Sequence, residues 1–272
     1  MVAQTHTSPV LLWSNDCIDV QHLVTNDFQI AFYTHRAPDK DSVNEDALAV
    51  FHCADKGVIL AIADGLGGQR DGALASQAMI ESLARNLKSA QQSNTDCRTA
   101  ILDAIEQANS RILNMGSGAA TTLAVVEAGK STIRSYHIGD SEILLTGQRG
   151  KLKFKTISHS PVGYAVEAGL LENEEALLHE DRHLVSNCVG VEDMHIDMGP
   201  VLTLAQYDTV LLASDGVFDN VTQDELVEMI RKGPLQKVAE TLLTHCQAIM
   251  RGQSNSHPGK PDDLSFILLR RN

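Results

Sequence analysis

Aromatic residues and long apolar runs are scarce in this sequence. Of the 272 residues, 4% are Phe, Trp or Tyr, so Leu, Ile, Val and Ala must supply most of the core. The longest apolar stretches, at 58–63 and 210–213, are strand-sized and far shorter than the ~20 residues of a membrane span. The start of the chain, MVAQTHTSPVLLW, has no basic segment and only a short apolar one, so we expect no signal peptide. These absences favour a soluble globular protein.

Basic residues are also few, and no two cysteines show the spacing of a metal-binding or redox motif. Lys and Arg number 22 against 35 Asp and Glu, a formal net charge of -13. An acidic field of this size repels nucleic acid and anionic membranes, so we expect neither as a partner. The five cysteines are scattered and show no C-x-x-C spacing. That pattern disfavours a zinc ribbon or a disulfide framework and favours the reducing cytoplasm.

Apolar periodicity predicts an α+β fold. The predicted strands are 29–33, 47–51, 58–63, 121–126, 133–138, 142–146, 209–213 and 265–270. The predicted helices are 74–87, 99–113, 222–232 and 235–250, with a short helical patch at 172–178. Strands and helices do not alternate strictly, which favours sheets packed together with helix pairs outside over a doubly wound parallel sheet. One domain over 27–272 suffices, preceded by an extension at 1–26.

The informative residues are carboxylates at the ends of predicted strands. The segment VILAIADG places Asp64 directly after a strand, and TVLLASDG repeats the arrangement for Asp215, with Ser214 between. The other members of the set flank further strands: Glu45, Asp46, Asp140, Asp262 and Asp263. An Asp-Gly pair is common in hairpin turns, but charged groups at the ends of buried strands are costly without partners. Repetition at five strand ends favours one site over a set of unrelated turns.

Convergence of these carboxylates would require a cation. Two carboxylates ~4 Å apart repel by ~4 kcal/mol at an effective dielectric of about 20, so a cluster of them does not stay ionised unaided. Oxygen ligands suit Mg²⁺ or Mn²⁺ rather than Zn²⁺. Two such ions bridged by one carboxylate would hold a water, lower its pKa and polarise a phosphoryl oxygen. The pattern therefore predicts metal-dependent hydrolysis of phosphate esters.

Other motifs for binding phosphate or nucleotides are incomplete. The stretch ADGLGGQRDG has Arg70 where a dinucleotide fingerprint needs glycine. The Gly-Lys-Ser at 129–131 lacks the leading glycine of a P-loop, because Ala124 stands there. His137 and His159 lie near the acidic motifs, but an isolated histidine is more often structural. None of these features competes with the carboxylate set.

Six segments, taken in order, resemble the motifs of the type-2C metal-dependent serine/threonine protein phosphatases. They are VNEDALAV (43–50), AIADGLGG (61–68), AATTLAVV (119–126), HIGDSEILL (137–145), LLASDGVFD (211–219) and KPDDLSFILL (260–269). Most of these motifs contain an acidic residue, which makes the resemblance specific. It implies a bacterial-type member with a four-layer α-β-β-α sandwich of two antiparallel sheets flanked by helix pairs, with the metals at one edge of the sheets.

The resemblance also implies roles for the carboxylates. Asp64 would bridge two Mn²⁺ or Mg²⁺ ions, and Asp215 and Asp262 would complete the first metal site. Glu45 and the backbone carbonyl of Gly65 would hold the second ion.

Further roles follow from the same resemblance. Asp140, together with Asp215, is similar to the ligand of a third, looser ion in bacterial-type members. Asp46 would orient metal-bound water, so Asp46, Asp64 and Asp215 are the expected catalytic residues. Segment 157–195 is similar to the family's mobile flap, which would select substrates. Turn or capping roles are expected for Asp208, Asp219 and Asp263.

Two positions depart from the family pattern. The phosphate-binding arginine normally lies four residues before the glutamate, where this chain has Asp41. Arg36 is therefore the predicted phosphate-binding residue, with Lys40 as the weaker alternative. The position after Asp64-Gly65 holds Leu66 in place of the histidine of animal-type members, which is typical of bacterial-type ones.

The predicted function is hydrolysis of phosphoserine and phosphothreonine in proteins, at a binuclear Mn²⁺ or Mg²⁺ centre. Two alternatives stay open: a catalytically weak regulatory relative that binds phosphopeptides, motivated by Asp41, and a hydrolase of small phosphate esters. The expected partner is a phosphoprotein modified by a serine/threonine kinase, in signalling, and we expect a cytoplasmic monomer.

Overall fold

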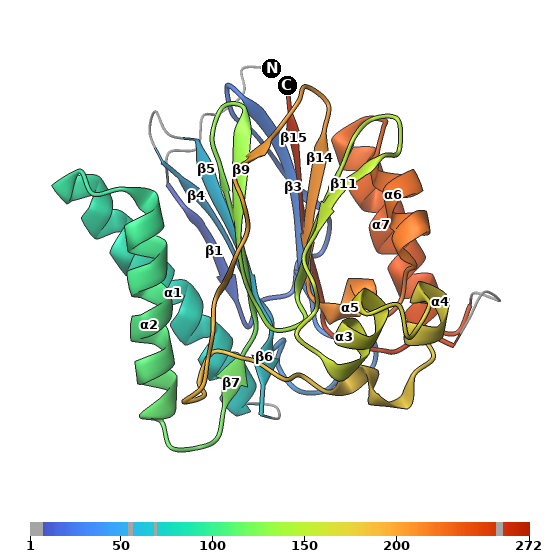
Figure 1. The fold of residues 1–272 in the computed structure, drawn as a ribbon, viewed down its shortest axis with the longest axis horizontal. Coiled ribbons are helices and arrows are strands. Elements are labelled where there is room, and N and C mark those ends of the chain that lie inside the picture. Colours follow the sequence, from blue (N-terminus) through green and yellow to red (C-terminus); the bar gives the residue numbers. More distant parts are fainter. Residues whose placement is uncertain (1–7, 54–56, 68–69, 254–257) are drawn as a thin grey trace.

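The structure is a computed structural model that describes residues 8–53, 57–67, 70–253 and 258–272. Two antiparallel sheets lie face to face, and a pair of helices covers the outer face of each (Figure 1). This arrangement is the predicted four-layer α-β-β-α sandwich. In the part of the chain that the structure describes, no helix is long and apolar enough to cross a bilayer.

The first sheet has the strand order β1-β4-β5-β8-β9-β12, with β13 also paired to β9. Its strands are β1 (Val10–Trp13), β4 (Ala47–His52), β5 (Val58–Ala63), β8 (Leu123–Ala128), β9 (Thr132–Ile138), β12 (Asp197–Met198) and β13 (Leu202–Thr203). The helices α1 (Arg70–Ser93) and α2 (Cys97–Leu113) cover its outer face. A short ribbon of β6 (Gly65–Leu66) and β7 (Ala120–Thr121) extends from one end.

The second sheet has the strand order β11-β10-β14-β15-β3-β2. Its strands are β11 (Leu152–Lys155), β10 (Glu142–Thr146), β14 (Thr209–Ala213), β15 (Leu264–Arg271), β3 (Phe28–His35) and β2 (Gln21–Val24). The helices α6 (Gln223–Ile230) and α7 (Leu235–Met250) cover its outer face. Four short helical elements lie near the end of the sandwich: α3 (Pro161–Glu167), α4 (Asn173–Ala176), the 3₁₀ turn η2 (Glu180–His183) and α5 (Asp215–Phe218).

Alternation along the strands explains the layers. In β4, Leu48 and Val50 pack between the two sheets, whereas Ala47, Ala49 and Phe51 face α1 and α2. Successive side chains of a strand point to opposite faces, so a continuous apolar run is buried on both. The sandwich therefore has three apolar layers: one between the sheets and one under each helix pair.

The structure differs from the expected extension at 1–26. Within its described part, β1 pairs with β4 and β2 pairs with β3, so both strands belong to the sheets. Both strands are only four residues long, and β2 is mostly exposed, so neither gives a clear period in the sequence. The capping box at Thr222 and Glu225 is confirmed as the start of α6.

Candidate metal centre

Strand register brings the carboxylates to one end of the sandwich. The last residue of β5, Ala63, pairs with the first residue of β4, Ala47, which places Asp64 beside Glu45 and Asp46. In the second sheet, the last residue of β14, Ala213, pairs with Glu142 at the start of β10 and with Phe266 near the start of β15. Asp215 therefore lies beside the segments that carry Asp140 and Asp262.

The buried charges of the two sheets meet at Asp64. Burial raises the pKa of the Asp64 carboxyl well above its usual range, and Asp46, Asp215, Asp262 and Asp140 raise it further. Carboxylates from both sheets therefore act on the charge of Asp64. A ligand that bridges two metal ions, the role predicted for Asp64, needs such a position.

The backbone around Asp64 is held rigidly. Its carbonyl oxygen accepts from the Thr121 hydroxyl and from the Thr122 amide, both at 2.8 Å, and its own amide donates to the Thr122 hydroxyl at 3.0 Å. A Cβ at Gly65 would lie 2.2 Å from the carbonyl oxygen of Gly72, in the first turn of α1. Glycine is therefore required for α1 to approach the strand end this closely.

Asp46 and Asp263 are both almost fully buried, but their hydrogen-bond partners differ. Asp46 Oδ2 accepts from the Ser214 hydroxyl at 2.9 Å, while its Oδ1 has no hydrogen-bond partner among the described residues. Asp263 accepts from the backbone amides of Ala37 and Glu45, at 2.8 and 2.7 Å. Asp263 therefore organises the loop before β4, which is the turn role expected for it, and Asp46 keeps an oxygen available.

Two lysines, Lys40 and Lys260, lie within the acidic cluster, and no role was expected for Lys260 from the sequence. The contacts of Lys260 are the more numerous. Its Nζ atom lies 2.5 Å from Asp215 Oδ2, 2.7 Å from Asp219 Oδ2 and 3.3 Å from Asp262 Oδ2. Lys40 Nζ lies 2.8 Å from Glu45 Oε2 and 2.7 Å from Asp263 Oδ2. The ammonium groups therefore balance part of the negative charge.

The charge balance remains incomplete. Burial, together with the neighbouring Asp215, raises the pKa of Asp262 to about 7 and that of Asp219 to about 6. Burial also raises the pKa of Asp46 and Asp140 well above the usual range, with neighbouring aspartates contributing. Asp140 Oδ1 is buried with no hydrogen-bond partner in the described ranges. Several carboxyl groups at this centre thus lack enough positive charge nearby to stabilise their ionised form. An oxygen-rich set of this kind fits Mg²⁺ or Mn²⁺.

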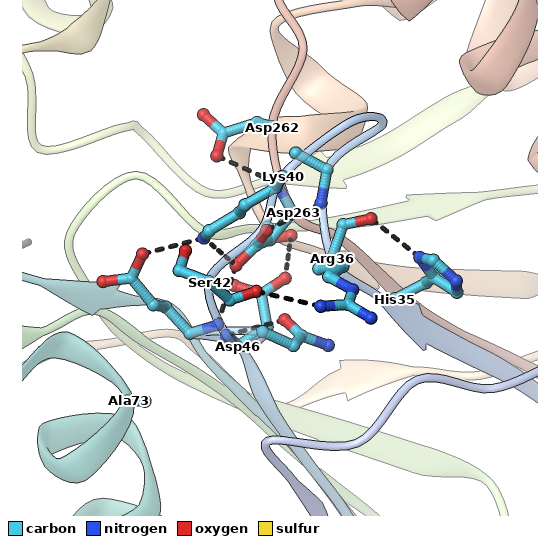
Figure 2. A network of polar contacts seen from close by, with 12 residues as sticks. His35, Arg36, Lys40, Ser42, Asp46, Ala73, Asp262 and Asp263 are labelled. Atoms are coloured by element: carbon cyan, nitrogen blue, oxygen red, sulfur yellow. Dashed lines mark hydrogen bonds and ion pairs between the residues drawn. The ribbon is translucent and has the colours of Figure 1, made fainter. Parts of the chain in front are cut away.

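The two candidate phosphate-binding residues are placed differently. Arg36 Nε lies 3.0 Å from Asp16 Oδ2, and its Nη1 donates to the Ser42 carbonyl at 3.3 Å. Figure 2 shows the Lys40 side chain reaching over Asp263, whereas Arg36 extends toward Ser42. Lys40 is thus part of the acidic cluster in this structure, whereas Asp16 and Ser42 hold Arg36 beside the cluster.

A second group of possible ligands lies on β9 and its neighbours. Ligand atoms of His137, His159 and Asp197 lie within 4.8 Å of one another. His159 Nδ1 accepts from the Gly139 amide at 3.1 Å, so its proton is on Nε2, which faces Asp197 Oδ2 at 3.2 Å. A metal at Nε2 would have to displace that proton, because Nδ1 is already used as an acceptor. The group is therefore a structural support for the turn at Gly139, next to Asp140.

His137 is buried in the same group. Burial, together with the neighbouring His159, lowers its pKa to about 3. The ring is therefore neutral at physiological pH and contributes no charge to the acidic centre.

Comparison with known proteins gives the same family that the motifs resemble. Residues 35–248 match the family described as Protein phosphatase 2C. The serine/threonine phosphatase stp of Listeria welshimeri is 28% identical over 239 residues, which cover 84% of this chain and 90% of that protein.

Solved structures agree in fold. The S. agalactiae serine/threonine phosphatase has 25% sequence identity and a TM-score of 0.76, covering 90% of this chain and 100% of that one. The catalytic domain of the phosphatase PstP, in complex with two manganese ions, has 23% identity and a TM-score of 0.69, covering 90% and 98% of the two chains. With most of its length matched and with acidic strand ends gathered as the motifs predict, this chain belongs to the protein phosphatase 2C family.

Proposed function

We propose that this protein hydrolyses phosphoserine and phosphothreonine esters of proteins, using water activated at a binuclear Mn²⁺ or Mg²⁺ centre. The supporting observation is the gathering of Asp64 with Asp46, Asp140, Asp215 and Asp262 in one cluster, in which Asp46 and Asp140 are buried and the other three are partly buried. Membership of the protein phosphatase 2C family is consistent with this chemistry.

The proposed metal ligands follow the sequence-based assignment. Asp64 would bridge both ions, Asp215 and Asp262 would complete the first site, and Glu45 with the Gly65 carbonyl would hold the second. Bound there, divalent ions supply a water of lowered pKa and polarise the phosphoryl oxygens.

A looser third ion is proposed between Asp140 and Asp215. Asp140 Oδ1 is buried and has no hydrogen-bond partner in the described part of the chain. That orphaned oxygen supports a cation at this position, because a buried acceptor without a donor is costly.

The remaining side chains would position water and phosphate. Asp46 holds one oxygen on Ser214 and presents the other, so it is suited to orient the attacking water. We propose Arg36 as the phosphate-binding residue. To reach a bound phosphate, its guanidinium group would have to break its ion pair with Asp16. Lys40 competes for this role, because its ammonium already lies beside Glu45.

The physiological setting is also a proposal. The family relationship supports a phosphoprotein substrate of a serine/threonine kinase, hence a role in signalling. The scattered cysteines support a cytoplasmic location, and we propose that the protein acts as a monomer.

The proposed function is tested by offering purified protein a phosphothreonine peptide with Mn²⁺ and with EDTA. Turnover that requires the metal is the expected result. Faster turnover of nucleotides or sugar phosphates than of the peptide would favour the small-ester alternative. Metal binding without turnover of any substrate would favour the regulatory alternative.

A further inference from the structure

The ammonium group of Lys260 contacts the proposed ligands of the first metal ion. Its Nζ atom lies 2.5 Å from Asp215 Oδ2 and 3.3 Å from Asp262 Oδ2, and both carboxylates belong to the proposed first site. Only 18% of the Lys260 side chain is exposed, so the ammonium is held inside the centre. Lys260 therefore shares two carboxylates with the first ion.

A third carboxylate holds the same ammonium but belongs to no proposed metal site. Asp219 Oδ2 lies 2.7 Å from Lys260 Nζ. Asp215 begins α5 and Asp219 is the residue at its C-terminal end, one turn later, so the two carboxylates are neighbours on one side of the helix. The ammonium can therefore give up Asp215 and keep Asp219 through a change of side-chain rotamer alone.

The backbone of Lys260 is held against α5. Asn220 Nδ2 donates to the Lys260 carbonyl at 2.8 Å and to the Gly216 carbonyl in α5 at 3.0 Å. A Cβ at Gly216 would collide with the Asp263 carbonyl oxygen, so α5 also packs tightly against the segment that follows Lys260. The start of the Lys260 side chain is therefore fixed beside the centre, and its flexible stem is the part that responds to a bound ion.

The second proposed metal site shows the same arrangement. Lys40 Nζ lies 2.8 Å from Glu45 Oε2, a proposed metal ligand, and 2.7 Å from Asp263 Oδ2, which is not one. Figure 2 shows the Lys40 side chain beside Asp263. At both proposed sites, a lysine thus pairs with a ligand carboxylate and also with a carboxylate outside the ligand set. This repetition favours a common role over a chance contact at Lys260.

A divalent ion and the ammonium compete for these carboxylates. Positive charges that lie close together in a partly buried site repel each other strongly. An ion that binds Asp215 and Asp262 must therefore break their ion pairs with Lys260. The free energy of breaking these pairs opposes metal binding and lowers the affinity of the site.

We propose that Lys260 competes with the divalent ion for Asp215 and Asp262, and that Asp219 holds the ammonium when the ion is bound. The inference rests on the proposed metal centre and adds a regulation of it, because the contacts of Lys260 set the Mn²⁺ concentration at which the first site fills. The ammonium is a displaceable counter-ion that stabilises the carboxylates of the metal-free protein.

Calorimetric titration of Mn²⁺ into metal-stripped protein tests this proposal. Lys260→Met is expected to bind Mn²⁺ about tenfold more tightly than wild type, which corresponds to about 1.4 kcal/mol. Lys260→Gln is a second neutral variant with the same expected gain, and it covers the case of a Met variant too unstable to titrate. Lys260→Arg keeps the positive charge and is expected to bind Mn²⁺ with wild-type affinity. Circular dichroism shows whether each variant is folded.

The matched control is Lys237→Met, which removes the same charge from the exposed face of α7 and is expected to leave the Mn²⁺ affinity unchanged. Asp262→Asn removes a proposed ligand of the first ion. The binding step that this variant weakens therefore identifies the first site in the titrations.

Mn²⁺ binding by folded neutral variants that is no tighter than that of wild type would overturn the inference, because a lysine that only supports the fold gives that result. A gain as large in Lys260→Arg or in Lys237→Met would also overturn it, since the charge at position 260 would then not be the cause. Failure of the proposed function looks different, because neither wild type nor the Lys260 variants would then bind Mn²⁺.

Discussion

The side-chain amide of Asn220 holds the backbone of Lys260 from both sides. Its Oδ1 accepts from the Lys260 amide and its Nδ2 donates to the Lys260 carbonyl, both at 2.8 Å. Asn220 is fully buried, so this bracket is fixed relative to the core. It fixes the start of a side chain whose ammonium reaches Asp215, Asp219 and Asp262.

We therefore predict that Lys260→Met destabilises the metal-free protein. The carboxylates would lose their neighbouring cation, and the free energy of unfolding should fall by about 2 kcal/mol. This loss lies between those typical of breaking an exposed and a buried ion pair. Urea denaturation in EDTA measures the effect. Lys237→Met on the exposed face of α7 is the matched control, and equal losses in the two variants would contradict the role given to Lys260.

The stability of the metal-free protein should depend on pH through Asp262. Its pKa is about 7 in the folded protein and near its ordinary value when unfolded, so the folded state binds the proton more tightly. This contribution to stability is fully present below about pH 4 and is lost as the pH rises through about 7.

The variant Asp262→Asn removes that contribution together with the part of the Asp64 shift that Asp262 causes, whereas the buried histidines titrate equally in both proteins and cancel in the difference. Relative to the variant, wild-type protein should lose about 1 kcal/mol between pH 4 and pH 8, after allowance for solvent screening. Denaturation curves in EDTA across this range provide the comparison. A wild-type protein that gains stability relative to Asp262→Asn would show the sign to be wrong.

Substitution of the two candidate phosphate-binding residues separates their roles. Arg36→Ala is expected to raise KM for a phosphothreonine peptide severalfold with little change in kcat, because it weakens substrate capture. Steady-state kinetics with Arg36→Lys as the conservative comparison measures this. An unchanged KM in Arg36→Ala, together with a raised KM in Lys40→Ala, would transfer the role to Lys40.

The acidic strand ends could be predicted from sequence because each follows or precedes a strand with a clear apolar pattern. Asp64 directly follows the apolar strand β5, and Asp215 follows the mostly apolar strand β14 with only Ser214 between; both strands are fully buried. In an antiparallel sandwich, alternate strand ends share one edge, so their convergence followed from the topology that the motifs implied.

The partners of Asp219 could not be predicted in the same way. Asp219 and Lys260 are 41 positions apart in the sequence, and their contact depends on the buried bracket at Asn220. Two helical elements near the carboxylate centre are also short: α5 spans four residues and α3 seven. Periodicity needs a longer window than these provide, so neither helix could be predicted from the sequence.

The most direct measurement is calorimetric titration of Mn²⁺ into wild-type protein and Asp64→Asn, with phosphothreonine peptide turnover measured on the same samples. We expect at least two Mn²⁺ ions per wild-type chain and metal-dependent turnover. For a folded Asp64→Asn we expect weakened Mn²⁺ binding and no turnover, since that carboxylate is proposed to bridge both ions. Retained Mn²⁺ stoichiometry and turnover in Asp64→Asn would contradict the assignment of this centre.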